Sequence, residues 1–330
     1  MKKIFKKTRP LIQAVQGLAL LSLATSCLSV FGQDSTSVES NDSGDPVGQS
    51  GDPVPATGPV TNSLPIRFLV GGSRQFNTGV DNGGNFSVNS FRTALGVPYR
   101  INDQYSVAAG LAYQLDSYNF GGGFQGWGDI NTLTATIGLT YRYDQHWLIY
   151  GGPIVRTAAE GSDWSNATEG GGDVGFTYIA SPDLRLGAGI VVIGQIEENA
   201  KVLPIITANW KFAEDWRFRL GFSDLGTAGY GGRVTWDFVP KWQWFFDFHS
   251  QTSRFRIEGS GITTDGVGQE SSINLTTGPT WSPCAAFSAS AFVGVAEGGK
   301  VAVDTSSGHQ IRNDSYNAAP ILGLRANFTF

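Results

Sequence analysis

Apolar and polar residues alternate one by one along most of the chain beyond Leu64. In segment 133–143 the odd positions are apolar, whereas the even positions carry Thr, Gly and Arg. Segments 184–192 and 216–223 repeat this pattern. Successive side chains of a β-strand point to opposite faces, so each segment predicts a strand with one apolar and one polar face. No segment in this region has a convincing helical period, and we expect an all-β fold.

The breaks between these strands alternate between short and long. Short turns fall at Asn102-Asp103, Asp144-Gln145, Pro182-Asp183, Glu214-Asp215, Pro240-Lys241 and Pro283-Cys284. Longer or Gly-rich connections fall near residues 76–86, 119–129, 158–172, 194–201, 223–229, 258–271 and 296–317. The order predicts fourteen strands, with twelve as the alternative count, and places both chain ends beside the short turns. The predicted strands are 65–75, 87–100, 104–118, 130–143, 146–157, 172–181, 184–194, 202–213, 216–223, 229–238, 242–257, 271–281, 285–295 and 318–330.

Alternation also occurs in soluble β-sandwiches, which are the alternative fold. Two further features favour a membrane barrel. The polar faces are rich in Thr, Gly, Ser and Asn and poor in charge, and aromatic rings gather beside the short turns, as in a girdle at a membrane–water boundary. The girdle residues are Tyr99, Tyr105, Tyr141, Tyr143, Trp147, Trp210, Trp216, Trp236, Trp242, Trp244 and Trp281. We therefore expect a closed, antiparallel, up-and-down transmembrane β-barrel with short periplasmic turns and longer extracellular loops.

Residues 1–32 have the features of a secretory signal peptide. A basic start containing Lys2 and Arg9 is followed by an apolar stretch and by small or aliphatic residues before Gln33. An alternative is a lipoprotein signal in which Cys27 is acylated. Residues 33–63 are rich in Ser, Asp, Gly and Pro and lack aromatic residues, which predicts a disordered periplasmic linker. Residues 64–330 then form the barrel.

Charge and cysteine content exclude some functions. Residues 1–32 hold five basic and no acidic residues, so their removal lowers the net charge from −5 to −10. Nucleic-acid binding needs a basic surface and is not expected. Only Cys284 remains beyond residue 32, so we expect no intramolecular disulfide.

The end of the chain resembles a known signal. Leu322, Leu324, Ala326, Phe328 and Phe330 share one parity of the last strand, which resembles the assembly signal of bacterial outer-membrane proteins. The outward positions that match this signal include Leu324, Phe328 and Phe330. The hairpin patterns at 99–104 and 141–145 resemble an uncharacterised barrel family, the domain of unknown function 6268. These resemblances imply the outer membrane of a Gram-negative bacterium, with its lipid and the barrel-assembly machinery as partners.

The inward parity of the predicted strands carries many basic residues. They are Arg67, Arg92, Arg100, Arg142, Arg185, Lys211, Arg217, Arg219, Arg233 and Arg325. Inward acids are fewer: Asp116, Asp237 and Asp247. A ring of basic side chains favours anions, so this basic collar predicts a channel or porin for small anionic solutes. In the alternative interpretation, the arginines pair with these acids and with turn acids, and brace a closed lumen.

Catalysis is not expected, because the chain has only three His residues, and Ser250 points away from its neighbour His249. No His/Cys cluster indicates zinc, and no cofactor is expected. The many acids in the long connections lack the spacing of a calcium loop, so we interpret them as solvated. A structural or adhesion-type barrel without transport is the alternative function, since the bulky inward residues Val191, Ile193 and Phe245 would help to fill a lumen.

Overall fold

The computed structural model describes residues 65–330 except 162–163, 165, 223–229, 259–262 and 264. The predicted signal peptide and linker therefore lie outside the described residues. The strands are β1 (Arg67–Gly79), β2 (Asn85–Arg100), β3 (Tyr105–Gly121), β4 (Asp129–Arg142), β5 (Trp147–Glu160), β6 (Thr168–Ser181), β7 (Leu184–Gln195), β8 (Glu198–Ala213), β9 (Trp216–Phe222), β10 (Tyr230–Val239), β11 (Trp242–Arg256), β12 (Val267–Cys284), β13 (Phe287–Asp304), β14 (Gln310–Ser315) and β15 (Ala319–Thr329). Among these described residues, no helix is long and apolar enough to cross a membrane.

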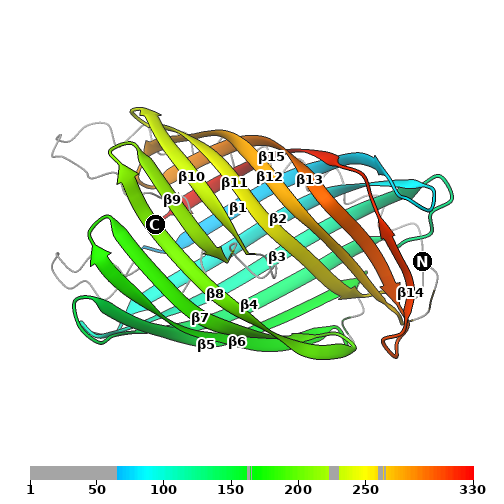
Figure 1. Ribbon diagram of the computed structural model, residues 1–330, viewed down its shortest axis with the longest axis horizontal. Coiled ribbons are helices and arrows are strands. Elements are labelled where there is room, and N and C mark those ends of the chain that lie inside the picture. Colours follow the sequence, from blue (N-terminus) through cyan, green and yellow to red (C-terminus); the bar gives the residue numbers. More distant parts are fainter. Residues whose placement is uncertain (1–64, 162–163, 165, 223–229, 259–262, 264) are drawn as a thin grey trace.

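Fourteen of these strands close into one antiparallel barrel, which confirms the predicted fold and strand count (Figure 1). Each strand from β1 to β12 pairs with the next, β13 pairs with β15, and β15 pairs with β1. Backbone hydrogen bonds between Ile66 and Phe330 join the two ends of the described chain beside the short turns. The fifteenth strand, β14, pairs only with the outer end of β13, at Lys300–Asp304.

The two faces of the wall differ as the alternation predicted. On β4, Ile137 is 56% exposed on the outside, whereas the inward Thr134 is 3% exposed. Other outward residues, such as Leu139, Val174 and Leu322, are similarly exposed. The barrel therefore has an apolar outer surface and a largely polar interior.

The predicted girdle residues lie beside the short turns, where several rings contact each other from strand to strand. Tyr105 stacks on Tyr141 at 4.9 Å between ring centroids, and Trp216 stacks on Trp236 at 5.5 Å. In the last strand, Leu324 and Phe330 are exposed, whereas Phe328 lies between Phe68 and Phe287 and is buried. The membrane and assembly roles of these residues stay predictions.

The outer connections differ from the sequence prediction. The long connection expected at 194–201 is wrong, because β7 and β8 continue to Gln195 and Glu198 and leave a tight turn at Ile196-Glu197. Likewise, β13 extends to Asp304 and is followed by β14, within a segment predicted as a long loop. These extensions lie beyond the outward apolar residues, so their faces lack the contrast between apolar and polar residues on which the prediction depended.

Candidate functional site: the lumen and its outer end

Two rows of basic side chains lie on the inward face. Arg92 and Arg325 are both in register with Gly71, so only a glycine separates them across β2, β1 and β15. On β9 and β10, Arg219 lies opposite Arg233, and Lys211 of β8 lies opposite Arg217. The wall thus places several like charges on neighbouring strands. The role of the collar in ion selectivity stays a prediction.

Part of the predicted collar acts as a brace. Arg100 donates from Nη2 to Asp103 Oδ1 at 2.8 Å and from Nε to the carbonyl oxygen of Asn102 at 3.2 Å. Both contacts lie in the β2–β3 turn, so this arginine stabilises the turn, as the alternative interpretation predicted for arginines of this type.

The middle of the lumen contains a charged and aromatic layer. Arg233 forms an ion pair with Asp247, with 2.7 Å between Nη2 and Oδ2. The guanidinium carbon of Arg233 lies 4.8 Å from the ring centroid of Phe245, which is 2% exposed, and that of Arg325 lies 5.9 Å from the same ring. Aromatic faces attract cations, so Phe245 holds both arginines against one region of the wall.

A cluster of aromatic side chains fills the outer end of the lumen. We call it the aromatic plug; its members are Phe86, Tyr118, Phe120, Phe124, Trp127, Phe255 and Tyr316. Ring centroids of Trp127 and Phe255 are 4.9 Å apart, and those of Tyr118 and Trp127 are 5.4 Å apart. Strands β3 and β11 are not neighbours in the barrel, so their side chains meet by reaching across the interior.

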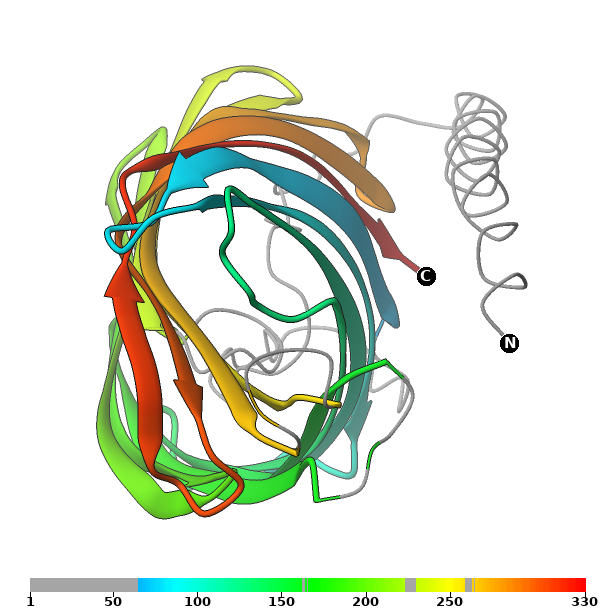
Figure 2. The ribbon, with the colours of Figure 1, turned by 90° about the vertical axis from the view of Figure 1, so that its right-hand side faces the viewer.

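The β3–β4 connection carries part of the plug into the barrel. Figure 2, a view into the end that bears the long connections, shows this segment folded inside the ring of strands. Glu160 Oε1 accepts a hydrogen bond from the backbone N–H of Gly128 at 2.7 Å, and its Oε2 accepts one from Glu258 at 3.0 Å. The guanidinium carbon of Arg312 lies 3.8 Å from the ring centroid of Phe124. These contacts hold the connection inside the lumen.

Two tyrosine hydroxyls of the plug donate hydrogen bonds to the buried carboxylate of Glu270. They come from Tyr118 on β3 and from Tyr316, which follows β14, with 3.0 Å for the second bond. Burial, and then the nearby charge of Glu270, raise the pKa of the Tyr316 hydroxyl. This hydroxyl therefore keeps its proton and remains a donor.

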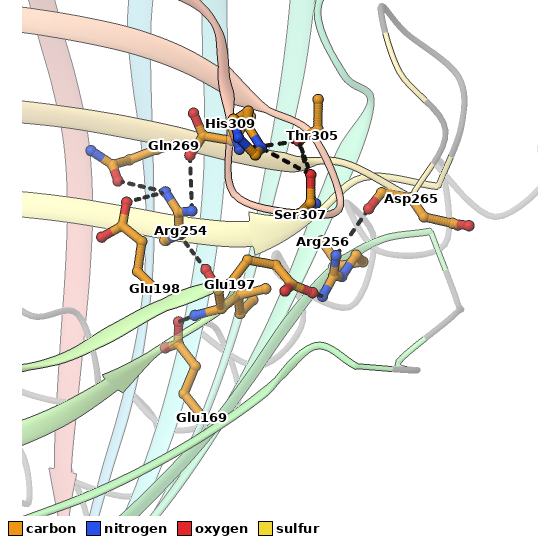
Figure 3. Close-up of polar contacts among 12 residues, drawn as sticks. Glu169, Glu197, Glu198, Arg254, Arg256, Asp265, Gln269, Thr305, Ser307 and His309 are labelled. Atoms are coloured by element: carbon orange, nitrogen blue, oxygen red, sulfur yellow. Dashed lines mark hydrogen bonds and ion pairs between the residues drawn. The ribbon is translucent and has the colours of Figure 1, made fainter.

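Three arginines tie the outer ends of separate strands together, an arrangement we call the arginine clasp. Figure 3 shows two of them, Arg254 and Arg256. Arg254 contacts Asp304 at 2.8 Å, Glu198 at 3.1 Å and the carbonyl oxygen of Ile196 at 2.7 Å. Arg256 contacts Glu197 at 2.6 Å, and also the carbonyl oxygens of Asn166 and Asp265. Arg156 on β5 pairs with Glu169 at 2.9 Å and donates to the carbonyl oxygen of Arg254 at 3.0 Å.

The clasp draws the end of β11 across the mouth of the barrel. Arg256 of β11 bridges Ala159 of β5 in a parallel backbone pair, although five strands lie between β5 and β11 in the sheet order on one side. Arg254 and its partner Asp304 have side chains that are only 3% and 9% exposed. The plug and the clasp together occupy the outer end of the lumen.

Sequence reasoning placed the acids of the clasp but missed their role. Glu169 and Asp304, like Glu160 and Asp314, are buried rather than solvated. The three arginines of the clasp, Arg156, Arg254 and Arg256, lie in strands. Alternation along β11 assigns Arg254 and Arg256 to the face that points away from the lumen. The sequence signal that could have revealed the clasp was a charged residue on the otherwise apolar outward face, near the end of a strand.

Two further polar clusters contain a histidine side chain, and the first of them stabilises the β13–β14 turn. Ser307 Oγ lies 3.1 Å from His309 Nδ1, but Thr305 Oγ1 accepts hydrogen bonds from the backbone N–H groups of both residues (Figure 3). His249 Nε2 lies 3.3 Å from Asn274 Nδ2 inside the barrel. Among the described residues, no group of three or more His, Cys, Asp or Glu side chains could hold a metal ion.

Comparisons with known proteins find likeness in structure but not in sequence. No family model matches the chain, so the resemblance to the domain of unknown function 6268 is not confirmed, and no curated protein matches it. An outer-membrane channel from Pseudomonas putida F1 is 12% identical with a TM-score of 0.45, and covers 84% of this chain and 100% of its own. A FadL homologue of Pseudomonas aeruginosa is 9% identical with a TM-score of 0.47, over 80% and 90% of the two chains. The toluene transporter TbuX of Ralstonia pickettii is 11% identical with a TM-score of 0.43, also over 80% and 90%. These three solved structures are, like this chain, β-barrels.

Proposed function

We propose that this protein is an outer-membrane channel of a Gram-negative bacterium that passes small anionic solutes. The observation that carries the proposal is the contrast between the two faces of a closed fourteen-stranded wall. Exposed aliphatic and aromatic residues outside suit lipid, and a polar, arginine-bearing interior suits a water-filled pore. Export by the signal peptide and insertion by the barrel-assembly machinery belong to the same proposal.

Fixed positive charge on the inward face supports anions as the solute. Arg219 faces Arg233, and Lys211 faces Arg217, on adjacent strands. Side chains of one sign lining a pore attract counter-ions and repel co-ions. The plug and the clasp make the described conformation the closed state of the channel.

Conductance of the purified protein in a planar bilayer tests this proposal. Under a KCl gradient, we expect the reversal potential to lie close to the equilibrium potential of chloride. In the double variant Lys211→Gln/Arg217→Gln, it should shift toward the equilibrium potential of potassium. The variant Lys201→Gln, changed at an exposed outer position, is the matched control. A cation-selective wild type would contradict the anionic solute.

A structural barrel without transport is the second candidate, and the plug is the observation that favours it. The two candidates differ once the outer end is loosened. The double variant Trp127→Ala/Arg254→Ala should conduct much more often than the wild type if the protein is a channel. A folded double variant that never conducts would favour the structural barrel.

A further inference from the structure

A buried carboxyl group lies at the centre of the contacts that hold the aromatic plug. Glu270 on β12 is 8% exposed, and its two carboxylate oxygens accept hydrogen bonds from different members of the plug. Oε2 accepts from the hydroxyl of Tyr118, and Oε1 accepts from that of Tyr316. In the ring of strands, β13, β15, β1 and β2 lie between β12 and β3. The bond between Glu270 and Tyr118 therefore crosses the interior of the barrel.

The two tyrosines pack directly against other rings of the plug. The ring centroid of Tyr118 lies 5.4 Å from that of Trp127, which the β3–β4 connection carries into the lumen. The ring centroid of Tyr316 lies 4.9 Å from that of Phe86, in an edge-on contact. A change in the hydrogen bonds of Glu270 therefore alters how firmly the plug is held.

A second carboxylate acts on Glu270 from β3. Asp116 precedes Tyr118 by two residues on the inward face of this strand and is 4% exposed. Arg92 and Arg156 attract the charge of Asp116, which in turn repels a negative charge on Glu270. The closed plug thus brings two buried acidic groups close enough to affect each other, and like charges disfavour ionisation.

The cations around this region have carboxylate partners of their own. Arg156 donates to Ser253, which is the register neighbour of Glu270 on β11. Arg312 lies on β14, which pairs with β13 on the other side of Glu270. The ion pairs of these two cations are Arg156–Glu169 and Arg312–Asp314. Among the described residues, none of the groups that act on Glu270 itself is a cation.

Glu270 lies outside the part of β12 that would cross a membrane. It is eleven residues beyond Trp281 on this strand, or roughly 26 Å outward from the girdle at about 3.3 Å per residue and a 45° tilt, whereas the apolar band is about 25 Å tall. Burial raises the pKa of the Glu270 carboxyl group from 4.5 to about 7; the Tyr118 hydroxyl opposes this shift, and the charge of Asp116 adds to it. When the plug opens, water reaches this carboxyl group, and its pKa falls toward the ordinary value.

A protonated Glu270 can keep both of its hydrogen bonds. One carboxyl oxygen still accepts from one tyrosine, and the new O–H donates to the hydroxyl oxygen of the other, because a hydroxyl both donates and accepts. Protonation therefore removes a buried charge without breaking the contacts to the plug. Ionisation restores both the cost of burying that charge and its repulsion by Asp116.

We propose that Glu270 is a proton-binding site that holds the plug closed in acid and releases it as the pH rises. This deepens the proposed function, and its effect on conductance rests on that function. The closed plug binds the proton more tightly than the open one, so a low pH favours closure. Between about pH 4.5 and 7, the ratio of closed to open protein should fall by up to about tenfold for each pH unit.

Hydrogen exchange at residues 122–128 of the β3–β4 connection, followed by mass spectrometry, tests the site in vesicles. The wild type and Glu270→Gln are compared at the same pH, which cancels the direct effect of pH on exchange. Glutamine stays neutral and offers one acceptor and one donor, as the protonated carboxyl group does. The ratio of wild-type to variant exchange rates should be at least about tenfold higher at pH 8 than at pH 5. An equal ratio at both pH values would overturn the proposal.

Two further variants separate the proton site from a merely structural role. Glu297→Gln changes an exposed glutamate on β13 and is the matched control, so its exchange should follow that of the wild type at both pH values. Asp116→Asn keeps Glu270 and removes the charge that repels it. The pH at which exchange accelerates should therefore move downward in this variant, which also serves if Glu270→Gln does not fold. An unchanged or higher value would contradict the site.

Bilayer conductance distinguishes failure of the proton site from failure of the channel. In a conducting protein, openings of the wild type should be more frequent at pH 8 than at pH 5, and Glu270→Gln should abolish this difference. A conducting protein whose exchange ratio ignores pH refutes the proton site and leaves the channel intact. A protein that never conducts but whose exchange ratio follows pH supports the proton site and contradicts the channel.

Discussion

Arg254 of β11 and Asp304 at the outer end of β13 form a nearly buried ion pair, with 2.8 Å between Nη2 and Oδ2. Strand β12 lies between their strands in the barrel. The same guanidinium donates to the carbonyl oxygen of Ile196 in the β7–β8 turn at 2.7 Å. One side chain thus connects three outer segments that are far apart in the sequence, and its removal should affect all three.

We expect Arg254→Ala to destabilise the barrel by roughly 3 kcal/mol, because it leaves the Asp304 carboxylate buried without its cation. Urea unfolding of the vesicle-bound protein measures this loss, and bilayer recordings should show more frequent opening. Lys201→Ala is the matched control, since its pair with Glu198 joins exposed side chains and is worth less than about 1 kcal/mol. If the two variants were equally stable, the clasp would not be a structural tie.

Trp127 should respond differently to two substitutions. Its ring is 4% exposed, and its buried Nε1 has no hydrogen-bond partner among the described residues. Trp127→Phe removes this unsatisfied donor and keeps an aromatic ring, so we expect little loss of stability. Trp127→Ala leaves a cavity and should cost roughly 3–5 kcal/mol and raise the conductance. Equal losses in thermal unfolding of the two variants would contradict this account.

Glu160 should control whether the β3–β4 connection stays inside the lumen. Its two carboxylate oxygens accept from Gly128 and Glu258 separately, so Glu160→Ala should release both segments. Hydrogen exchange at residues 122–128, followed by mass spectrometry, should become at least several-fold faster. Glu160→Gln retains one carbonyl oxygen as an acceptor and should have a smaller effect. Unchanged exchange in Glu160→Ala would show that ring packing alone holds the connection.

Gly152 of β5 is required for close approach to β4. A Cβ atom built there would lie 1.8 Å from the carbonyl oxygen of Ile137. Gly152→Ala should therefore force the two strands apart and reduce the yield of folded barrel, measured by heat-modifiable gel migration. Gly170→Ala is the control, because a Cβ at that position has no heavy atom within 4 Å. Similar folded yields for both variants would rule out the steric account.

The parts of the fold that contact two different environments were predictable from sequence. Alternation located the central segments, such as those around Ile137 and Leu186, because apolar and polar faces differ strongly there. The outer ends of β7, β8 and β13 were not predictable. These ends extend beyond the outward apolar residues, so their two faces do not differ in polarity. Strand β14 was missed for the same reason.

The sequence predicted which residues face the lumen, but not which of them contact each other. Parity placed Arg233, Asp247 and Phe245 on the inward face, where they form one charged and aromatic layer. The plug was missed because Tyr118 and Phe255 lie on strands that are not neighbours in the barrel. Their side chains meet only because the sheet closes into a ring, and the alternation within each strand does not encode this closure.

The pairing of β1 with β15 has a consequence for how the barrel is made. Arg67 is in register with Thr329, so the ring cannot close until a segment more than two hundred residues away has arrived. Until then the partly built sheet carries two open edges, which invite pairing with other chains. The two edges of the incomplete sheet therefore remain unpaired until the final hairpin docks, and this interval is when the polypeptide is most exposed to aggregation.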